Sequence, residues 1–139
     1  MTGVGNWDPN QGKEDSKAAI DNSRLMRFIA IAESNQLDQL GRVLTQQEID
    51  ADRPLMKIHK DAWATAAEPL NNEQLIQLIR FFTLAEEQLP GWEAGSLSPV
   101  VWLCRALKSR GAFPDQELIQ WIKTNSRNKF LPYGNILDF

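Results

Sequence analysis

Apolar side chains recur every three or four residues along most of this chain, which is the spacing of one face of an α-helix. The clearest run covers residues 72–88, where apolar positions take up well over half of the helix circumference. A helix with so narrow a polar side has to be surrounded by other elements. The pattern therefore predicts a central helix over 72–88, with Asn71 or Asn72 as its N-cap.

Two shorter helices are predicted ahead of this central one. Leu, Phe, Ile and Ala positions at helical spacing predict a helix over residues 23–33, for which either Asn22 or Ser23 is a suitable N-cap. A second, shorter helix is expected over residues 36–44, where Gly41 lowers the helix propensity.

The next segment contains both a helix start and a helix break. Thr45 and Glu48 have the spacing of a capping box, in which each side chain bonds the backbone amide of the other residue. A helix should therefore begin directly after Thr45. Pro54 has no backbone N–H and clashes with a preceding helical turn. We expect a break just before it and a new helix over residues 54–68.

Two further helices are predicted in the last third of the chain. Ser98 followed by Pro99 is a strong start signal, because serine caps a helix and proline suits its first turn. Gly111 is the corresponding stop signal. Asp115 can cap a last helix, which ends near Asn125.

These elements amount to about six or seven helices, with no alternating strand pattern and no internal repeat. The sequence therefore predicts an all-α protein, an irregular bundle around one core. Residues 1–21 show no apolar period and are expected to form a flexible N-terminal arm. Residues 22–139 are expected to form a single helical domain with an apolar C-terminal tail.

Composition narrows the setting in which this protein works. Hydrophobic residues make up 42% of the chain and charged residues 24%, as in ordinary globular proteins. No apolar stretch approaches the roughly 20 residues that a membrane-spanning helix needs, and the first residues do not form a secretory signal. Cys104 is the only cysteine, which suits a reducing compartment. We expect a cytoplasmic protein that does not bind membranes.

Few residues are suited to catalysis or metal binding. His59 is the only histidine, which excludes metal motifs built on a histidine pair, and a solvent-facing role on a helix is favoured for it. Cys104 has apolar neighbours, which favours a buried, unreactive thiol. Glu86 and Glu87 lie outside any calcium-loop pattern, and a solvated helix face explains them more simply. We therefore expect no enzyme activity, no cofactor and no metal.

Charge is distributed unevenly along the chain. Residues 1–104 hold nine Lys and Arg against fifteen Asp and Glu, whereas residues 105–139 hold six against three. The basic C-terminal third supports nucleic-acid binding as an alternative hypothesis. Cations near helix C-termini also complement the helix dipole, and we favour that simpler interpretation. The alternative would use Arg105, Lys108, Arg110, Lys123, Arg127 and Lys129.

Large apolar residues also occur in segments with no helical pattern. The last ten residues contain six of them, and Trp92 follows Pro90 and Gly91. We favour a tail that folds back on its own core over one that docks on a partner, because large exposed apolar patches are uncommon on monomers.

The leading functional hypothesis is a non-catalytic interaction domain, either an adaptor for a protein partner or a homo-oligomer. An enzyme of unknown type is the weakest alternative. The residues assigned to partner binding are Trp92, Phe130, Leu131, Tyr133 and Phe139.

Overall fold

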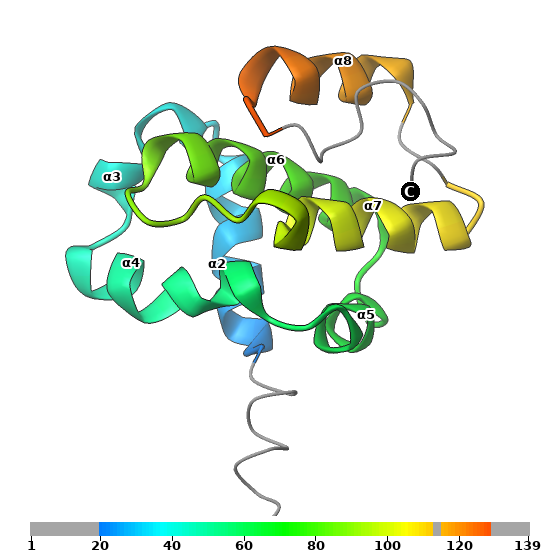
Figure 1. Cartoon of the computed structure of the whole chain (residues 1–139), viewed down its shortest axis with the longest axis horizontal. Helices are drawn as coiled ribbons and strands as arrows, with labels where there is room; N and C mark the ends of the chain where they lie inside the picture. The colour runs from blue at the N-terminus through cyan, green and yellow to red at the C-terminus, as the bar shows by residue number, and fades with distance from the viewer. Residues whose placement is uncertain (1–19, 113–114, 129–139) are drawn as a thin grey trace, which may run out of the picture.

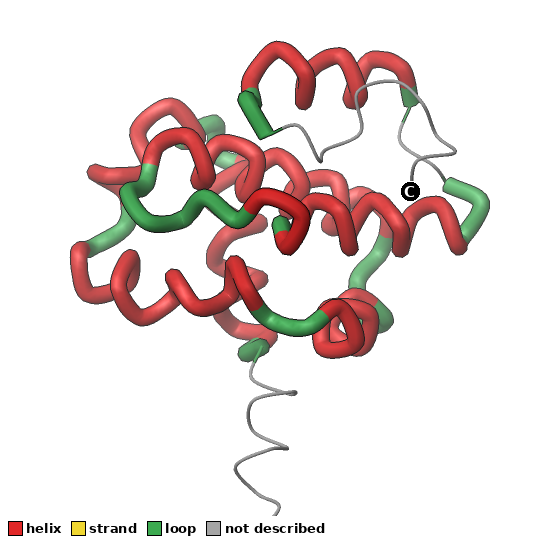
Figure 2. The backbone as a smooth tube through the Cα atoms, in the orientation of Figure 1, coloured by secondary structure: helices red, strands yellow, loops and turns green. Residues whose placement is uncertain are grey.

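The computed structural model describes residues 20–112 and 115–128, and this part of the chain forms seven α-helices, three short 3₁₀ helices and no strand (Figures 1 and 2). The predicted all-α bundle is confirmed. The arm and the tail predicted from the sequence fall almost entirely outside the described residues, so the division into domains stays a prediction. The α-helices are α2 (Asn22–Glu33), α3 (Leu40–Val43), α4 (Gln46–Asp52), α5 (Lys60–Ala67), α6 (Asn72–Gln88), α7 (Pro99–Ser109) and α8 (Gln116–Asn125), and the 3₁₀ helices are η1 (Leu37–Gln39), η2 (Arg53–Lys57) and η3 (Gly95–Leu97).

Helix α6 is the centre of the bundle, as its apolar pattern predicts. It packs against α2, α7 and α8 and also touches α3 and η1. Figure 1 shows α6 and α7 in a middle layer, with α8 above them and the α4 to α5 segment below. Asn71 is the N-cap of α6 and forms a capping box with Gln74, in which each side chain accepts a hydrogen bond from the other residue's backbone amide. None of the described helices is both long and apolar enough to cross a membrane.

Aromatic side chains fill the core around α6. Phe28 of α2 stacks on Phe81 with ring centroids 4.2 Å apart, while Trp63 of α5 meets Phe82 edge to face at 5.4 Å. The edge-to-face arrangement is favourable because the positive ring edge of one residue meets the negative ring face of the other. The core therefore joins α2, α5 and α6 through rings as well as through aliphatic contacts.

Three helix starts confirm their sequence signals. Thr45 and Glu48 form the predicted capping box at the start of α4. The Ser98 hydroxyl accepts a hydrogen bond from the Val100 amide at the start of α7, and the Asp115 carboxylate accepts one from the amide of Leu118 at the start of α8. Each cap satisfies an amide that the helix leaves without an internal partner, which stabilises a helix by about 1 kcal/mol.

The predicted single helix over residues 54–68 is wrong. Residues 53–57 form η2, the chain is extended at Ile58, and α5 begins at Lys60. The signal missed in the sequence is His59, whose Nδ1 accepts a hydrogen bond from the Asp61 amide at 3.1 Å and so acts as the N-cap.

Two details nearer the N-terminus also differ from the prediction. The N-cap of α2 is Asp21, which accepts a bond from the Ser23 amide, rather than Asn22 or Ser23. An ionised carboxylate also suits the positive end of the helix dipole. The predicted helix over residues 36–44 is divided into η1 and α3.

Two carboxylates are buried, and one of them, Glu86, was expected to lie on a solvated helix face. Asp52 is 6% exposed and binds Arg24, with Nη2 and Oδ2 2.6 Å apart. Glu86 is 5% exposed and accepts hydrogen bonds from the Ala94 amide, the Ser98 hydroxyl and the Asn128 side chain. These partners compensate the loss of water around each carboxylate.

Glu86 also fixes the path of the chain after α8. Asn128 donates to Glu86 at 3.1 Å and to the carbonyl of Gly95 at 2.9 Å. Arg127 adds an ion pair to Glu87 at 3.0 Å. The C-terminal end of α8 is thus held to α6 by polar contacts, in addition to the apolar contacts that α8 makes along its own length.

Candidate functional site

Trp92 lies in the core, which corrects the expectation that it forms part of a partner-binding surface. Its side chain is fully buried, and its indole N–H donates to the carbonyl of Ile49 at 3.3 Å. It also meets Phe81 edge to face. The loop after α6 therefore turns Trp92 inward. The other residues assigned to partner binding, Phe130, Leu131, Tyr133 and Phe139, lie outside the described residues.

The basic residues of the C-terminal third do not all remain available to an outside ligand. Arg110 donates to the carbonyl oxygens of Leu70 and Ala67 at 2.7 and 2.8 Å, where it caps the end of α5. Arg127 is paired with Glu87. Lys108 and Lys123 are exposed on α7 and α8, and Lys129 lies outside the described residues. The nucleic-acid hypothesis thereby loses Arg110 and Arg127 to contacts within the fold.

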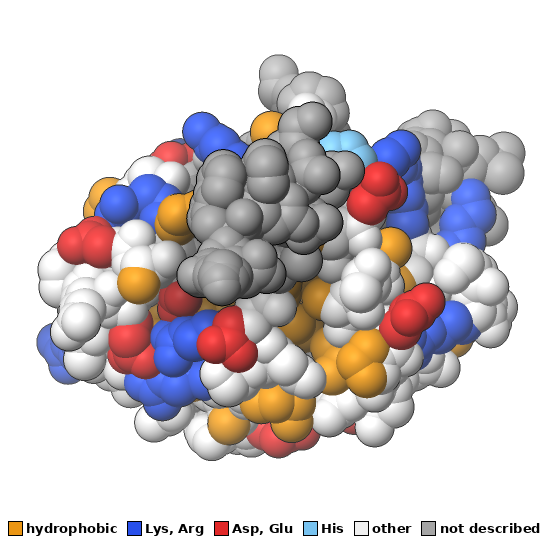
Figure 3. Space-filling view, turned by 90° about the horizontal axis from the view of Figure 1, so that it is seen from below, with side chains coloured by type: hydrophobic (Ala, Val, Ile, Leu, Met, Phe, Trp, Pro, Cys, Tyr) orange, Lys and Arg blue, Asp and Glu red, His pale blue; other side chains and the backbone are white. Residues whose placement is uncertain are grey.

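The face seen from below in Figure 1 also shows mixed charge. In Figure 3, Lys and Arg side chains lie beside Asp and Glu side chains on the described part of this face, and they do not form one broad basic patch. The described residues also include an ion-pair network in which Glu48 binds both Arg24 and Arg27. The guanidinium of Arg27, the amide of Thr45 and Arg24 lower the pKa of Glu48 to about 2.

A groove runs between α6 and α8. It consists of a cavity of about 390 Å³ and a second of about 240 Å³, which share Arg80 and Trp121 as a common wall. The Arg80 guanidinium lies over the Trp121 ring, 5.2 Å from its centroid. We call this surface the α8 groove. Its lining includes Asp38, Glu73, Ile76, Arg80, Leu84, Asp115, Glu117, Leu118 and Trp121.

The α8 groove combines an apolar floor with an acidic rim. Ile76, Leu118 and Trp121 supply apolar surface to the larger cavity, which three carboxylates also line, and a fourth carboxylate lines the smaller cavity. None of these carboxylates has a cation within ion-pair distance among the described residues, and Arg80 is the one cation of the described lining. The four carboxylates are Asp38, Glu73, Asp115 and Glu117.

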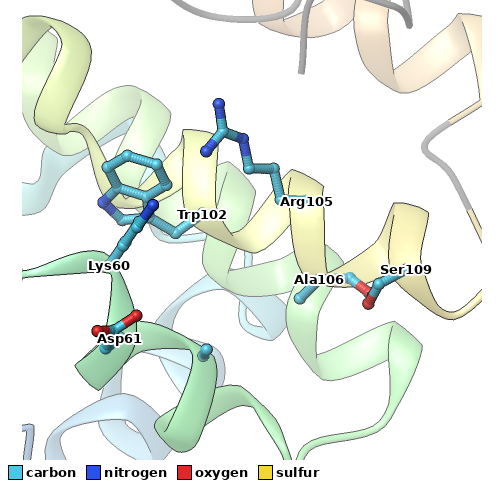
Figure 4. Close-up of a pocket in the computed structure, with 7 residues that line it drawn as sticks. Lys60, Asp61, Trp102, Arg105, Ala106 and Ser109 are labelled. Carbon is cyan, nitrogen blue, oxygen red and sulfur yellow. The ribbon is translucent and has the colours of Figure 1, made fainter.

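A second pocket, of about 210 Å³, lies between α5 and α7 (Figure 4). Trp102 and Arg105 of α7 contribute to its wall, and so does Lys60, the first residue of α5. The Arg105 guanidinium lies over the Trp102 ring, 5.1 Å from its centroid. The character of this pocket is cationic and aromatic, opposite to that of the α8 groove.

The two residues considered for catalysis, His59 and Cys104, both have structural roles in the described fold. His59 caps α5. Cys104 is fully buried in the core, and that burial raises the pKa of its thiol well above the ordinary value. Within residues 20–112 and 115–128, no three side chains of His, Cys, Asp or Glu are grouped so as to hold a metal ion.

Sequence reasoning missed the α8 groove, although part of its signal was visible. Glu73, Gln77 and Arg80 recur at helical spacing on α6 and were interpreted as a narrow solvent stripe. Trp121 is half-buried on α8, next to the buried residues Leu118 and Ile122. Only the packing of α8 over that stripe joins the two observations into one surface.

Comparison of the chain with protein-family models, with curated proteins and with solved structures gives no match.

Proposed function

We propose that this protein is a non-catalytic interaction domain that binds a basic, amphipathic segment of a partner protein in the α8 groove. The observation that carries the proposal is the apolar floor of the groove together with four lining carboxylates without a cation partner among the described residues. We further propose that the protein acts in the cytoplasm, a setting supported by its single, buried cysteine.

The apolar part of the groove favours a protein segment over a simple ion. Ile76 and Trp121 are only partly buried, so a partner side chain that covers them removes further apolar surface from water. Burial of apolar surface contributes roughly 25 cal/mol per Å². The larger cavity is within the range of about 300–1,000 Å³ typical of small-molecule pockets, which is enough space for large side chains.

The charge of the rim selects the sign of the partner. Glu73, Asp115 and Glu117 lie around the larger cavity, and Asp38 lies at the smaller one. A Lys or Arg of the partner gains an opposite charge there, whereas an acidic segment meets like charges. Arg80 is the one cation of the described lining against four carboxylates, so the net charge of the groove is negative.

A selection from displayed random peptides tests the proposal directly. We expect peptides enriched on the full-length protein to combine Lys or Arg with large apolar residues. Glu117→Lys should weaken their binding roughly threefold to tenfold, because it reverses one rim charge. Glu68→Lys is the matched control, since Glu68 is an exposed carboxylate at the end of α5, outside the groove lining. It should leave binding unchanged.

The apolar floor is tested with Trp121→Ala, which should abolish binding of the same peptides. A melting curve shows whether this variant still folds, and Glu117→Lys keeps the test decisive if it does not. The proposal fails if no peptide is enriched above background, if the enriched peptides are acidic, or if both variants bind them as the wild type does.

A further inference from the structure

The pocket between α5 and α7 has two cations with no acidic partner. Neither Lys60 nor Arg105 forms an ion pair within the described part of the chain. Arg105 contacts Trp102, with its guanidinium carbon 5.1 Å from the ring centroid. Two cations therefore line a pocket of about 210 Å³ without neutralisation.

The one acidic residue of the described lining, Asp61, is exposed to solvent and pairs with neither cation. Its Oδ2 lies 3.4 Å from Nδ1 of His59, and its side chain is 81% exposed. It lowers the formal charge of the lining from two to one but does not pair with either cation. The pocket remains positive next to an otherwise acidic protein, whose formal net charge is −3.

Trp102 lies beside both cations. Figure 4 shows Lys60 extending toward the Trp102 indole from α5, with Arg105 on the same helix as Trp102. The indole N–H of Trp102 is out of contact with solvent and has no hydrogen-bond acceptor among the described residues. The pocket thus offers an ammonium and a guanidinium as donors to a ligand, whereas the indole N–H is enclosed in the fold.

We propose that this pocket binds a phosphate monoester, held between Lys60 and Arg105 beside the Trp102 ring. A monoester carries close to two negative charges at neutral pH and three acceptor oxygens, which matches two cations better than a carboxylate does. Arg105 can bond two of these oxygens at once, while Lys60 supplies a point charge. The volume of the pocket limits the ligand to the phosphate and a short substituent.

This inference is independent of the proposed function, because none of its residues belongs to the α8 groove. The α8 groove takes a cationic partner and this pocket an anionic one. Failure of either proposal leaves the other standing.

Nuclear magnetic resonance of the tryptophan indole N–H groups tests the site. The Trp102 signal is assigned by its absence in Trp102→Phe, and the full-length protein is then titrated at constant ionic strength with phosphoserine, inorganic phosphate and acetate. We expect a saturable shift of the Trp102 signal with phosphoserine below millimolar concentration, and a weak response to acetate. Tighter binding of phosphoserine assigns an ester as the ligand, and equal binding of inorganic phosphate assigns the free ion.

Three variants show whether the named cations hold the phosphate. Lys60→Gln and Arg105→Gln should each weaken phosphoserine binding at least tenfold, whereas Lys123→Gln, an exposed lysine of α8, should not change it. Binding should also weaken below about pH 6, where the monoester takes up a proton.

Four results would overturn the proposal. They are no saturable shift with either phosphate, an equal response to acetate, unchanged affinity in both Lys60→Gln and Arg105→Gln, and binding of a short oligonucleotide when neither phosphate binds. The last result would transfer Arg105 to a nucleic-acid surface instead.

Discussion

Two buried tryptophans offer a direct measure of what a single buried hydrogen bond contributes to this fold. Trp92 and Trp63 are 0% and 1% exposed, and each meets a phenylalanine edge to face. They differ in one respect. The indole N–H of Trp92 bonds the carbonyl of Ile49 in the last turn of α4, whereas that of Trp63 has no acceptor among the described residues. The same change, Trp to Phe, therefore removes a bond at one site and an unsatisfied donor at the other.

The expected difference follows from these two environments. Both substitutions delete a similar apolar volume, so the cost of the cavity largely cancels between them. At 3.3 Å the bond from Trp92 to Ile49 is long, and its loss should cost about 1 kcal/mol. Removal of an unsatisfied N–H at Trp63 should recover about 1 kcal/mol of desolvation penalty. Trp92→Phe should thus be less stable than Trp63→Phe by about 2 kcal/mol.

Urea denaturation followed by far-ultraviolet circular dichroism measures this difference at one temperature. In a thermal melt the two variants should differ by roughly 8 °C, since about 4 °C corresponds to 1 kcal/mol in a domain of this size. Equal free energies of unfolding for the two variants, or a greater loss for Trp63→Phe, would refute the reasoning and show that the hydrogen bond of Trp92 contributes little.

Three further outcomes are expected. The free energy of unfolding should fall as the pH is lowered from about 4.5 toward 2, because the pKa of Glu48 is about 2 in the fold against 4.5 for the free side chain. Acid denaturation curves measure this dependence, and the Glu48→Gln variant should lose much of it. Cys104 should resist alkylation by iodoacetamide in the native protein and react on unfolding in urea; rapid native labelling would contradict its burial. Deletion of residues 130–139 should lower the melting temperature by several degrees and increase binding of a hydrophobic dye, and an unchanged melt would show that the tail does not pack on this domain.

Local signals account for the parts of the fold that were predicted. The capping residues Thr45, Ser98 and Asp115 act within three residues of their own positions, so the sequence alone contains both partners of each bond. The central position of α6 follows from its apolar circumference. His59 shows the limit of such signals, because histidine is an uncommon N-cap and its bond to Asp61 is not indicated by residue type.

Contacts between distant segments account for what was missed. Glu86 looks like a surface residue in sequence, and its burial depends on Ser98 and Asn128, which lie 12 and 42 residues away. Trp92 follows a proline and a glycine, as exposed loop residues often do. Its hydrogen-bond partner, however, is Ile49 of α4, which is distant in sequence. The same holds for both candidate sites, since each forms where two helices meet. No periodicity within one helix reveals its neighbour.

The central place of α6 has a consequence for how this protein can change over evolution. A substitution on α6 disturbs the packing of α2, α7 and α8, because α6 contacts all three helices. A substitution at an exposed position of α8 or at the start of α5 disturbs less packing. Proteins that inherit this fold should therefore diverge slowly in the buried positions of α6 and quickly at exposed positions. Both proposed binding surfaces include exposed residues, Glu117 in one and Lys60 in the other. Ligand preference can then drift from one descendant to the next while the interior stays the same.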